Sequence, residues 1–175
     1  MPGQPTRDAR RIATLAAIPV ALLVGLAVFA AQGGFAREDT GPVTMAAPAL
    51  GPRAAALCRA LLAELPGSLR DRKRRPVTAG AEQNAAYGDP PITLGCAAGP
   101  APSIAPETMV YGLSGVCWVA QLNSRGSVWT TVDREVPVTV TVPEAYSEPG
   151  QWVIEFSGPL VAAIPSISAP PGCRG

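Results

Sequence analysis

An apolar stretch near the N-terminus constrains this chain more than any other feature. Residues 12–31 read IATLAAIPVALLVGLAVFAA, in which Thr14 is the only polar side chain. An α-helix rises about 1.5 Å per residue, so these residues would span roughly 30 Å, the thickness of a bilayer's hydrocarbon core. Pro19 and Gly25 fit this assignment because both residue types are common in transmembrane helices. The stretch predicts one transmembrane helix.

The charges on either side of the stretch predict its orientation. Three arginines and one aspartate precede it, and one arginine and two acids follow it (Arg7, Asp8, Arg10, Arg11, Arg37, Glu38 and Asp39). The positive-inside rule then places residues 1–11 in the cytoplasm and the bulk of the chain outside the cell. We therefore expect a single-pass protein of the cell membrane with an extracellular C-terminal domain.

A cleavable signal peptide is the alternative interpretation of the same residues. Residues 28–30 (VFA) and 34–36 (GFA) offer the small side chains that a signal peptidase requires. The apolar stretch is longer than the usual ~7–15 residues of such a peptide, which favours an uncleaved signal anchor. Both interpretations export the rest of the chain.

The exported part divides into a linker and one domain. Residues 32–52 mix Gly, Pro, Ala and Thr without a helical or alternating period, which indicates a flexible linker. Residues 53–175 are expected to form the domain. It begins with a predicted helix over residues 54–65, in which leucines 57, 61, 62 and 65 share one face and Pro66-Gly67 is the stop signal. Residues 70–75 (RDRKRR) are read as a solvated loop rather than as a patch that binds lipid head groups.

The middle of the domain predicts an antiparallel sheet of about four strands. The expected strands are residues 91–96, 115–122, 126–133 and 136–142, and the last shows valine at every second position. Residues 123–126 (NSRG) predict a hairpin turn. Residues 152–164 are read as a C-terminal helix interrupted at Gly158-Pro159, or alternatively as a final strand and turn. The expected fold class is therefore α+β.

Composition excludes several classes of function. The net charge of +1 gives the molecule no strong attraction to nucleic acid. The chain contains no histidine, which removes Ser-His-Asp and Cys-His catalysis. It has no C-x-x-C motif and no glycine-rich phosphate loop, so we expect neither a metal nor a cofactor. Four carboxylates, Asp89, Asp133, Glu135 and Glu155, remain as candidates for acid–base chemistry, but their spacing singles out no pair and favours solvated surface acids.

The four cysteines, Cys58, Cys96, Cys117 and Cys173, all lie in the exported part. An even number of cysteines in an oxidising compartment predicts two disulfides. Three pairings are compatible with the residues alone. Chain entropy does not choose among them, because the Cys58–Cys96 and Cys117–Cys173 loops would each contribute about 4 kcal/mol.

The most distinctive string is AAYGDPPITLGC, residues 85–96, a two-proline turn followed by a strand that ends at a cysteine. Together with Cys58 and Leu65-Pro66, Gly115-Val116-Cys117-Trp118 and residues 136–143, it resembles the DUF3515 family, which comprises actinobacterial membrane-anchored proteins of unknown function. The resemblance covers nearly the whole chain. The chain departs from the family pattern at Tyr87, where the family has Trp, and at Gly95, where it has a basic residue.

The resemblance implies an exported, membrane-anchored topology and supplies no activity. It also implies a pairing, since Cys58 and Cys96 both belong to the family pattern. Cys117 and Cys173 are additions to that pattern, and two cysteines gained together are most simply explained by a bond between them.

Two functions remain open. The first is a non-catalytic interaction module of the cell envelope, attached to the membrane and in contact with another envelope protein. The alternative is a small carboxylate-dependent enzyme or ligand-binding domain that acts on cell-wall precursors.

Overall fold

The computed structural model describes residues 19–29, 39–105, 107–168 and 173. The chain divides into two units, Met1–Glu38 and Asp39–Gly175. In the first unit residues 19–29 are helical. Among the described residues, no helix is both long enough and apolar enough to cross a membrane. Residues 12–18 and 30–31 of the expected transmembrane helix lie outside the described residues, so that assignment stays a prediction.

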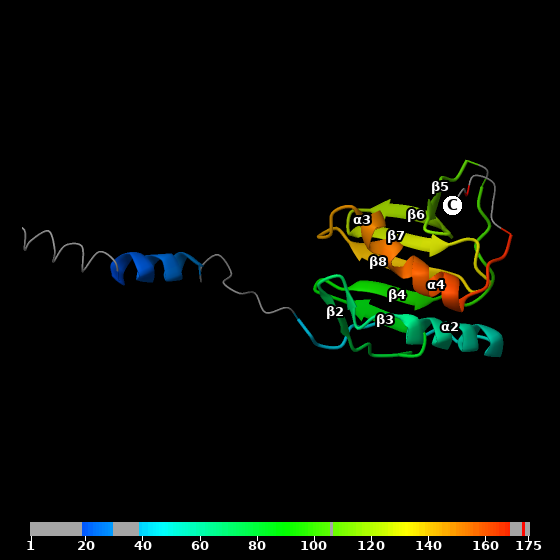
Figure 1. Ribbon diagram of the computed structural model, residues 1–175, viewed down its shortest axis with the longest axis horizontal. Coiled ribbons are helices and arrows are strands. Elements are labelled where there is room, and N and C mark those ends of the chain that lie inside the picture. Colours follow the sequence, from blue (N-terminus) through cyan, green and yellow to red (C-terminus); the bar gives the residue numbers. More distant parts are fainter. Residues whose placement is uncertain (1–18, 30–38, 106, 169–172, 174–175) are drawn as a thin grey trace, which may run out of the picture. The chain divides into compact units, whose positions relative to one another are not determined.

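The second unit is an α+β fold built on one eight-stranded antiparallel sheet (Figure 1). The strand order is β1-β2-β3-β4-β8-β7-β6-β5. The strands are β1 (Ser68–Leu69), β2 (Arg72–Arg75), β3 (Asn84–Tyr87), β4 (Ile92–Cys96), β5 (Val110–Leu113), β6 (Val116–Asn123), β7 (Gly126–Thr131) and β8 (Val138–Pro143). The fold class is confirmed, whereas the expected number of about four strands was wrong.

The four predicted strands are present as β4, β6, β7 and β8. In β8 the valines 138, 140 and 142 are buried and the threonines between them are half-buried, which is the burial that an alternating strand requires. The turn predicted at residues 123–126 joins β6 to β7, with Asn123 opposite Gly126. Gly126 has a φ of 136°, so glycine suits this position.

The four unpredicted strands are only two to four residues long, and β2 and β3 also lack a strand-like composition. β2 is Arg-Lys-Arg-Arg, and it pairs on one side with β1 and on the other with β3. The loop expected over residues 70–75 is therefore present only as a turn at residues 70–71, and it was wrong for residues 72–75. β3 is Asn-Ala-Ala-Tyr, which contains no β-branched residue. These segments are strands because their backbone groups pair with neighbouring strands, and a single-segment pattern does not reveal that.

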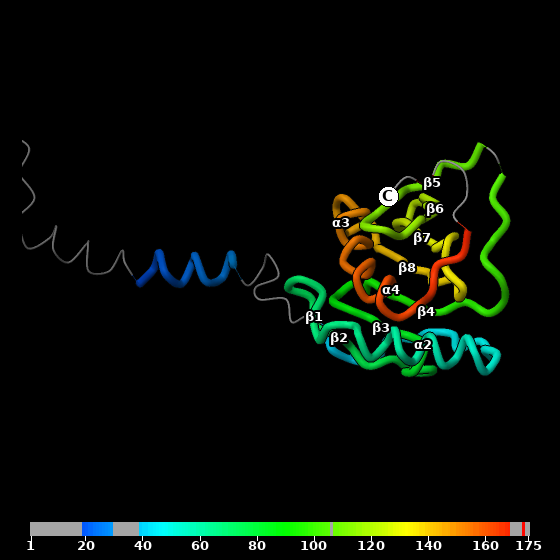
Figure 2. The backbone as a smooth tube through the Cα atoms, turned by 45° about the vertical axis from the view of Figure 1, so that its right-hand side comes forward, coloured from blue at the N-terminus to red at the C-terminus, as the bar shows by residue number. Residues whose placement is uncertain are grey.

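Three α-helices and one 3₁₀ turn cover one face of the sheet. Helix α2 (Pro52–Glu64) confirms the predicted first helix. The C-terminal helix is present as α3 (Pro149–Val153), η1 (Ile154–Phe156) and α4 (Ser157–Ala163), but α4 runs through Gly158-Pro159, so the interruption expected there was wrong. Figures 1 and 2 show α3 and α4 over the strands and α2 beside β3. The helical run tightens to a 3₁₀ turn at residues 154–156, because Pro159 has no N–H to donate to the Glu155 carbonyl and its ring crowds that group.

The folded unit begins at Asp39 rather than at residue 53, so the expected linker of residues 32–52 was too long. The Val43 N–H donates to the Pro76 carbonyl at 2.8 Å, and the Thr78 N–H donates to the Val43 carbonyl at 3.0 Å. Val43 itself is buried. This segment has no internal period because its hydrogen bonds go to another part of the chain.

Candidate functional site

Both predicted disulfides are present, with the pairing that the family resemblance implied. Cys58 of α2 is bonded to Cys96 of β4, with a Cα–Cα distance of 6.3 Å. Cys117 of β6 is bonded to Cys173, with a Cα–Cα distance of 5.9 Å. The first bond fastens a helix to the sheet, and the second fastens the C-terminal tail to the strand that carries Trp118.

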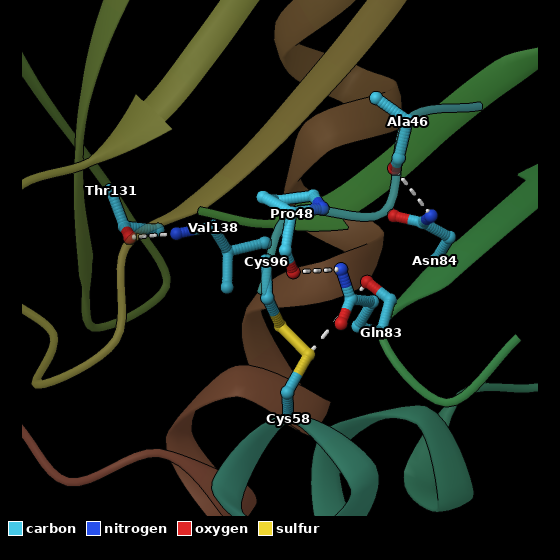
Figure 3. The surroundings of a disulfide bond; sticks show 8 residues. All are labelled: Ala46, Pro48, Cys58, Gln83, Asn84, Cys96, Thr131 and Val138. Atoms are coloured by element: carbon cyan, nitrogen blue, oxygen red, sulfur yellow. Dashed lines mark hydrogen bonds between the residues drawn. A yellow bond between two sulfur atoms is a disulfide. The ribbon is translucent and has the colours of Figure 1, made fainter. Parts of the chain in front are cut away.

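The Cys58–Cys96 bond lies in the hydrophobic core (Figure 3). The Cys96 N–H donates to the Gln83 carbonyl at 3.0 Å, and the Gln83 side-chain amide donates to the Pro48 carbonyl at 2.9 Å. The bond therefore connects α2 and β4 next to the point where residues 46–50 pack on the domain. Both cysteines are almost fully buried, which shields the sulfurs from external thiols and is typical of a structural disulfide.

Each of the four candidate acids is held by a different structural partner. Asp89 accepts the Asp39 N–H at 2.9 Å, and Asp133 accepts the Cys117 N–H at 3.1 Å. Glu135 accepts the Arg53 Nε–H at 2.9 Å, and Glu155 accepts the Arg70 Nε–H at 2.9 Å. No hydrogen bond or ion pair among the described residues joins two of these four acids. They do not form a paired acid–base site.

The electrostatics of Glu135 fit a structural role. The hydrogen bonds from Arg53 hold the pKa of Glu135 below its usual range, which keeps the carboxylate ionised. A general acid at neutral pH needs the opposite shift, an elevated pKa. In the described part of the chain, no group of three His, Cys, Asp or Glu side chains is placed to hold a metal ion.

The arginines of the basic run also serve the fold. Arg75 is buried, and its guanidinium donates to the carbonyls of Gly41 and Gly88 and, at 2.8 Å, to Asp39 Oδ2. Arg74 donates to the Leu62 carbonyl at 3.3 Å. Because these guanidinium groups are held by the domain itself, the run is not a free cationic patch.

The face of the sheet opposite the helices is rich in threonine over β4, β7 and β8 (Thr93, Thr130, Thr139 and Thr141). It carries two pockets of about 420 and 310 Å³ that share Ala97. The first lies between the sheet and the loop of residues 97–108, and the second lies beside residues 44–46. Neither lining contains a charged side chain, so neither pocket offers an acid–base group.

The candidate site is an apolar groove of about 400 Å³ between the sheet and α3, named here the β5–α3 groove. It is lined by Tyr111, Leu113, Ala120, Leu122, Trp129, Glu148, Pro149, Gly150, Gln151 and Ile154. Its floor is an aromatic pair, Tyr111 and Trp129, whose ring centroids lie 5.3 Å apart. The Trp129 Nε1–H donates to Ser127 Oγ at 2.9 Å, which holds the indole in place.

The groove exists because the helices do not cover the last residues of β6. Along this strand Trp118, Ala120 and Leu122 point to the helix-covered face. Trp118 is fully buried, whereas Leu122 is 77% exposed. Ala120 is too small to fill the space between them. Met109, immediately before β5, is 66% exposed and adds apolar surface at this end of the sheet.

One charged side chain lines the groove. Glu148 is exposed, adopts a left-handed backbone conformation with a φ of 52°, and immediately precedes α3. Its carboxylate forms no hydrogen bond or ion pair with the described residues. The groove thus combines an apolar floor with one unpaired negative charge at its rim.

Sequence reasoning missed this site. The available signal was Leu122, an apolar residue one position before the predicted turn and in phase with Trp118. Such a residue belongs to the covered face by its period, but its position at the strand end takes it beyond the reach of a short helix.

Comparison with known proteins supplies a family and no activity. A family model described as "Protein of unknown function (DUF3515)" matches residues 16–168. No curated protein and no solved structure matches the chain.

Proposed function

The chain belongs to the DUF3515 family, and from this premise we propose that it is a membrane-anchored protein of the cell envelope whose exported domain binds another protein without catalysis. The proposal names the apolar stretch of residues 12–31 as the anchor and the β5–α3 groove as the binding site.

The two disulfides support export. Disulfides persist in oxidising compartments and are rare in the cytosol. Residues 32–38 alone separate the apolar stretch from Asp39, and an extended chain of that length covers at most about 25 Å. A domain tethered so briefly would meet its partner near the membrane surface.

The exposure of Leu122 over the β5–α3 groove is the observation that carries the binding role. Leu122 is 77% exposed beside an apolar groove, so a partner that buries its side chain would lower the free energy of the complex. The acids, in contrast, are held in contacts that stabilise the fold, so no observation favours the carboxylate-dependent enzyme.

The topology is tested with a reporter that is active only outside the cytoplasm. Fused after Gly175, it should be active, and replacing Arg7, Arg10 and Arg11 with Glu should impair or invert insertion. An N-terminal tag that stays in the membrane pellet at high salt identifies the anchor, and loss of the tag identifies a cleaved signal peptide. Cytoplasmic activity of the unmutated fusion would refute export.

The binding role is tested by affinity purification of the full chain from detergent-solubilised membranes. A reproducible partner should be recovered with the unmutated chain and lost with Leu122→Glu. Val161→Glu is the matched control, because Val161 is 51% exposed on α4 and lies outside the groove. Equal recovery with all three chains would show that the groove is not the binding site.

A further inference from the structure

The groove lies next to an open edge of the sheet. β5 is the last strand in the order of the described sheet, where its neighbour is β6. Among the described residues, no other strand or bridge pairs with its outer edge. An unpaired edge strand presents a row of backbone donors and acceptors that can accept another strand.

The β5–β6 hairpin identifies which backbone groups point outward. The two strands are joined by Ser114 and Gly115, both with positive φ (46° and 79°), as in a type I′ turn. In such a hairpin the residues next to the turn, Leu113 and Val116, exchange backbone hydrogen bonds, and the pairs then alternate. The N–H and C=O groups of Val110 and Gly112 therefore point away from β6.

This edge has few of the features that normally prevent strand addition. β5 contains no charged residue and no proline, and Met109 before it is exposed. Its inward side chains, Tyr111 and Leu113, both line the β5–α3 groove. A free edge beside a side-chain pocket is the arrangement by which domains bind extended peptides, since the edge supplies backbone hydrogen bonds and the pocket selects alternate side chains.

We propose that the β5–α3 groove binds an extended segment of a partner protein, which adds to the edge of β5 as a ninth strand. This assignment rests on the proposed binding function and names the partner's chemistry. Every second side chain of the segment is apolar and enters the groove over Tyr111 and Trp129. A basic residue flanks these positions and pairs with Glu148, the only charged side chain in the groove's lining.

The assignment is tested with four synthetic peptides and the full chain in detergent micelles. The peptides have the sequence Lys-Thr-Val-Thr-X-Thr-Val-Lys with capped ends, where X is Val, Leu, Ile or Phe. At least one peptide should bind, and Leu122→Glu should weaken that binding tenfold or more. Val161→Glu should leave it unchanged. Glu148→Lys should weaken binding of these Lys-flanked peptides about two- to fivefold, as expected for an exposed ion pair. The same variant should bind more tightly to otherwise identical peptides that have Glu in place of the two terminal Lys residues.

Strand addition is distinguished from simple insertion of side chains by N-methylation. In an extended peptide, alternate amides point to opposite edges. One peptide is N-methylated at the central Thr residues and a second at the central apolar residues, so each lacks the N–H donors of one edge. Only one of these two methylated peptides should lose binding. Equal binding of both methylated peptides would overturn strand addition.

Two further results would overturn the assignment. One is failure of all four peptides to bind. The other is a concentration-dependent dimer of the chain that Leu122→Glu abolishes, which would assign the groove to a second copy. If the peptides fail while a partner sensitive to Leu122→Glu is still recovered from membranes, the extended-segment assignment is wrong and the proposed binding function stands.

Discussion

Removal of the two disulfides separately should destabilise the domain unequally, although chain entropy predicts nearly equal effects. The bonded residues are 38 and 56 positions apart. The loop-closure model converts these separations into about 3.9 and about 4.2 kcal/mol at 25 °C. Entropy alone would therefore make Cys117–Cys173 the slightly more stabilising bond.

Packing reverses this order. Cys58 and Cys96 are 0% and 4% exposed and belong to the hydrophobic core. The double variant Cys58→Ala/Cys96→Ala therefore also leaves a cavity in place of each sulfur atom, and each cavity should reduce the free energy of unfolding by about 1 kcal/mol. The expected loss is about 6 kcal/mol. Cys117 is also 4% exposed but lies outside the hydrophobic core cluster, and Cys173 is only half-buried, so Cys117→Ala/Cys173→Ala leaves less space and the expected loss is between about 4 and 5 kcal/mol.

Urea unfolding followed by circular dichroism measures the difference. Because small domains are stable by only about 5–15 kcal/mol, the Cys58/Cys96 double variant should be close to unfolded without denaturant. The Cys117/Cys173 double variant should unfold cooperatively at a moderately reduced urea concentration. Equal losses, or a larger loss for the Cys117/Cys173 variant, would refute the packing argument.

Three further outcomes are expected in the same assay. The pKa of Asp39 is below its usual range because the Gly41 N–H and Arg75 donate hydrogen bonds to it. The stability that the ionised Asp39 contributes is therefore present above the unfolded pKa of about 3.9 and is lost as the pH falls through the lower folded pKa. Asp39→Asn should destabilise the domain at pH 6, and the variant and the unmutated domain should become equally stable in strong acid. Gly126→Ala should cost more than about 3 kcal/mol, since its Cβ would lie 2.2 Å from the Val142 carbonyl oxygen at a φ of 136°, and a fully stable variant would contradict this geometry. Gly158→Ala, in α4, would place its Cβ more than 4 Å from every atom beyond its chain neighbours and its own helix backbone, but Pro159 disfavours a helical residue with a Cβ before it, so the change should be close to neutral; a gain of about 0.5–1 kcal/mol would show that Pro159 imposes no such cost.

Local patterns predicted the elements that carry their own signal. The leucines of α2 recur at helical spacing and the valines of β8 alternate, because each element buries one face of its own surface. The same reasoning failed for β2, whose Arg-Lys-Arg-Arg sequence resembles a solvated loop. In the fold, Arg75 is buried and bonded to Asp39 and two carbonyls, and a pattern within the strand contains no information about these distant partners.

The candidate site was less predictable than the fold. Sequence reasoning considered acids, cysteines and the basic run, which are the residues that carry chemistry. The β5–α3 groove is built instead from a strand edge, a small residue at Ala120 and the early end of a helical layer. These are relations between elements, and no residue in the groove is unusual by itself.

The sequence by itself determined the α+β class, the first helix, four of the strands and, through the family pattern, the pairing of the cysteines. These depend on periodicity and on residue types that short windows contain. Only the tertiary structure decided that residues 39–50 belong to the fold, that β5 ends the sheet and that Leu122 remains exposed. Each of these depends on which distant segments meet, because hydrogen bonding and burial are completed between segments rather than within them.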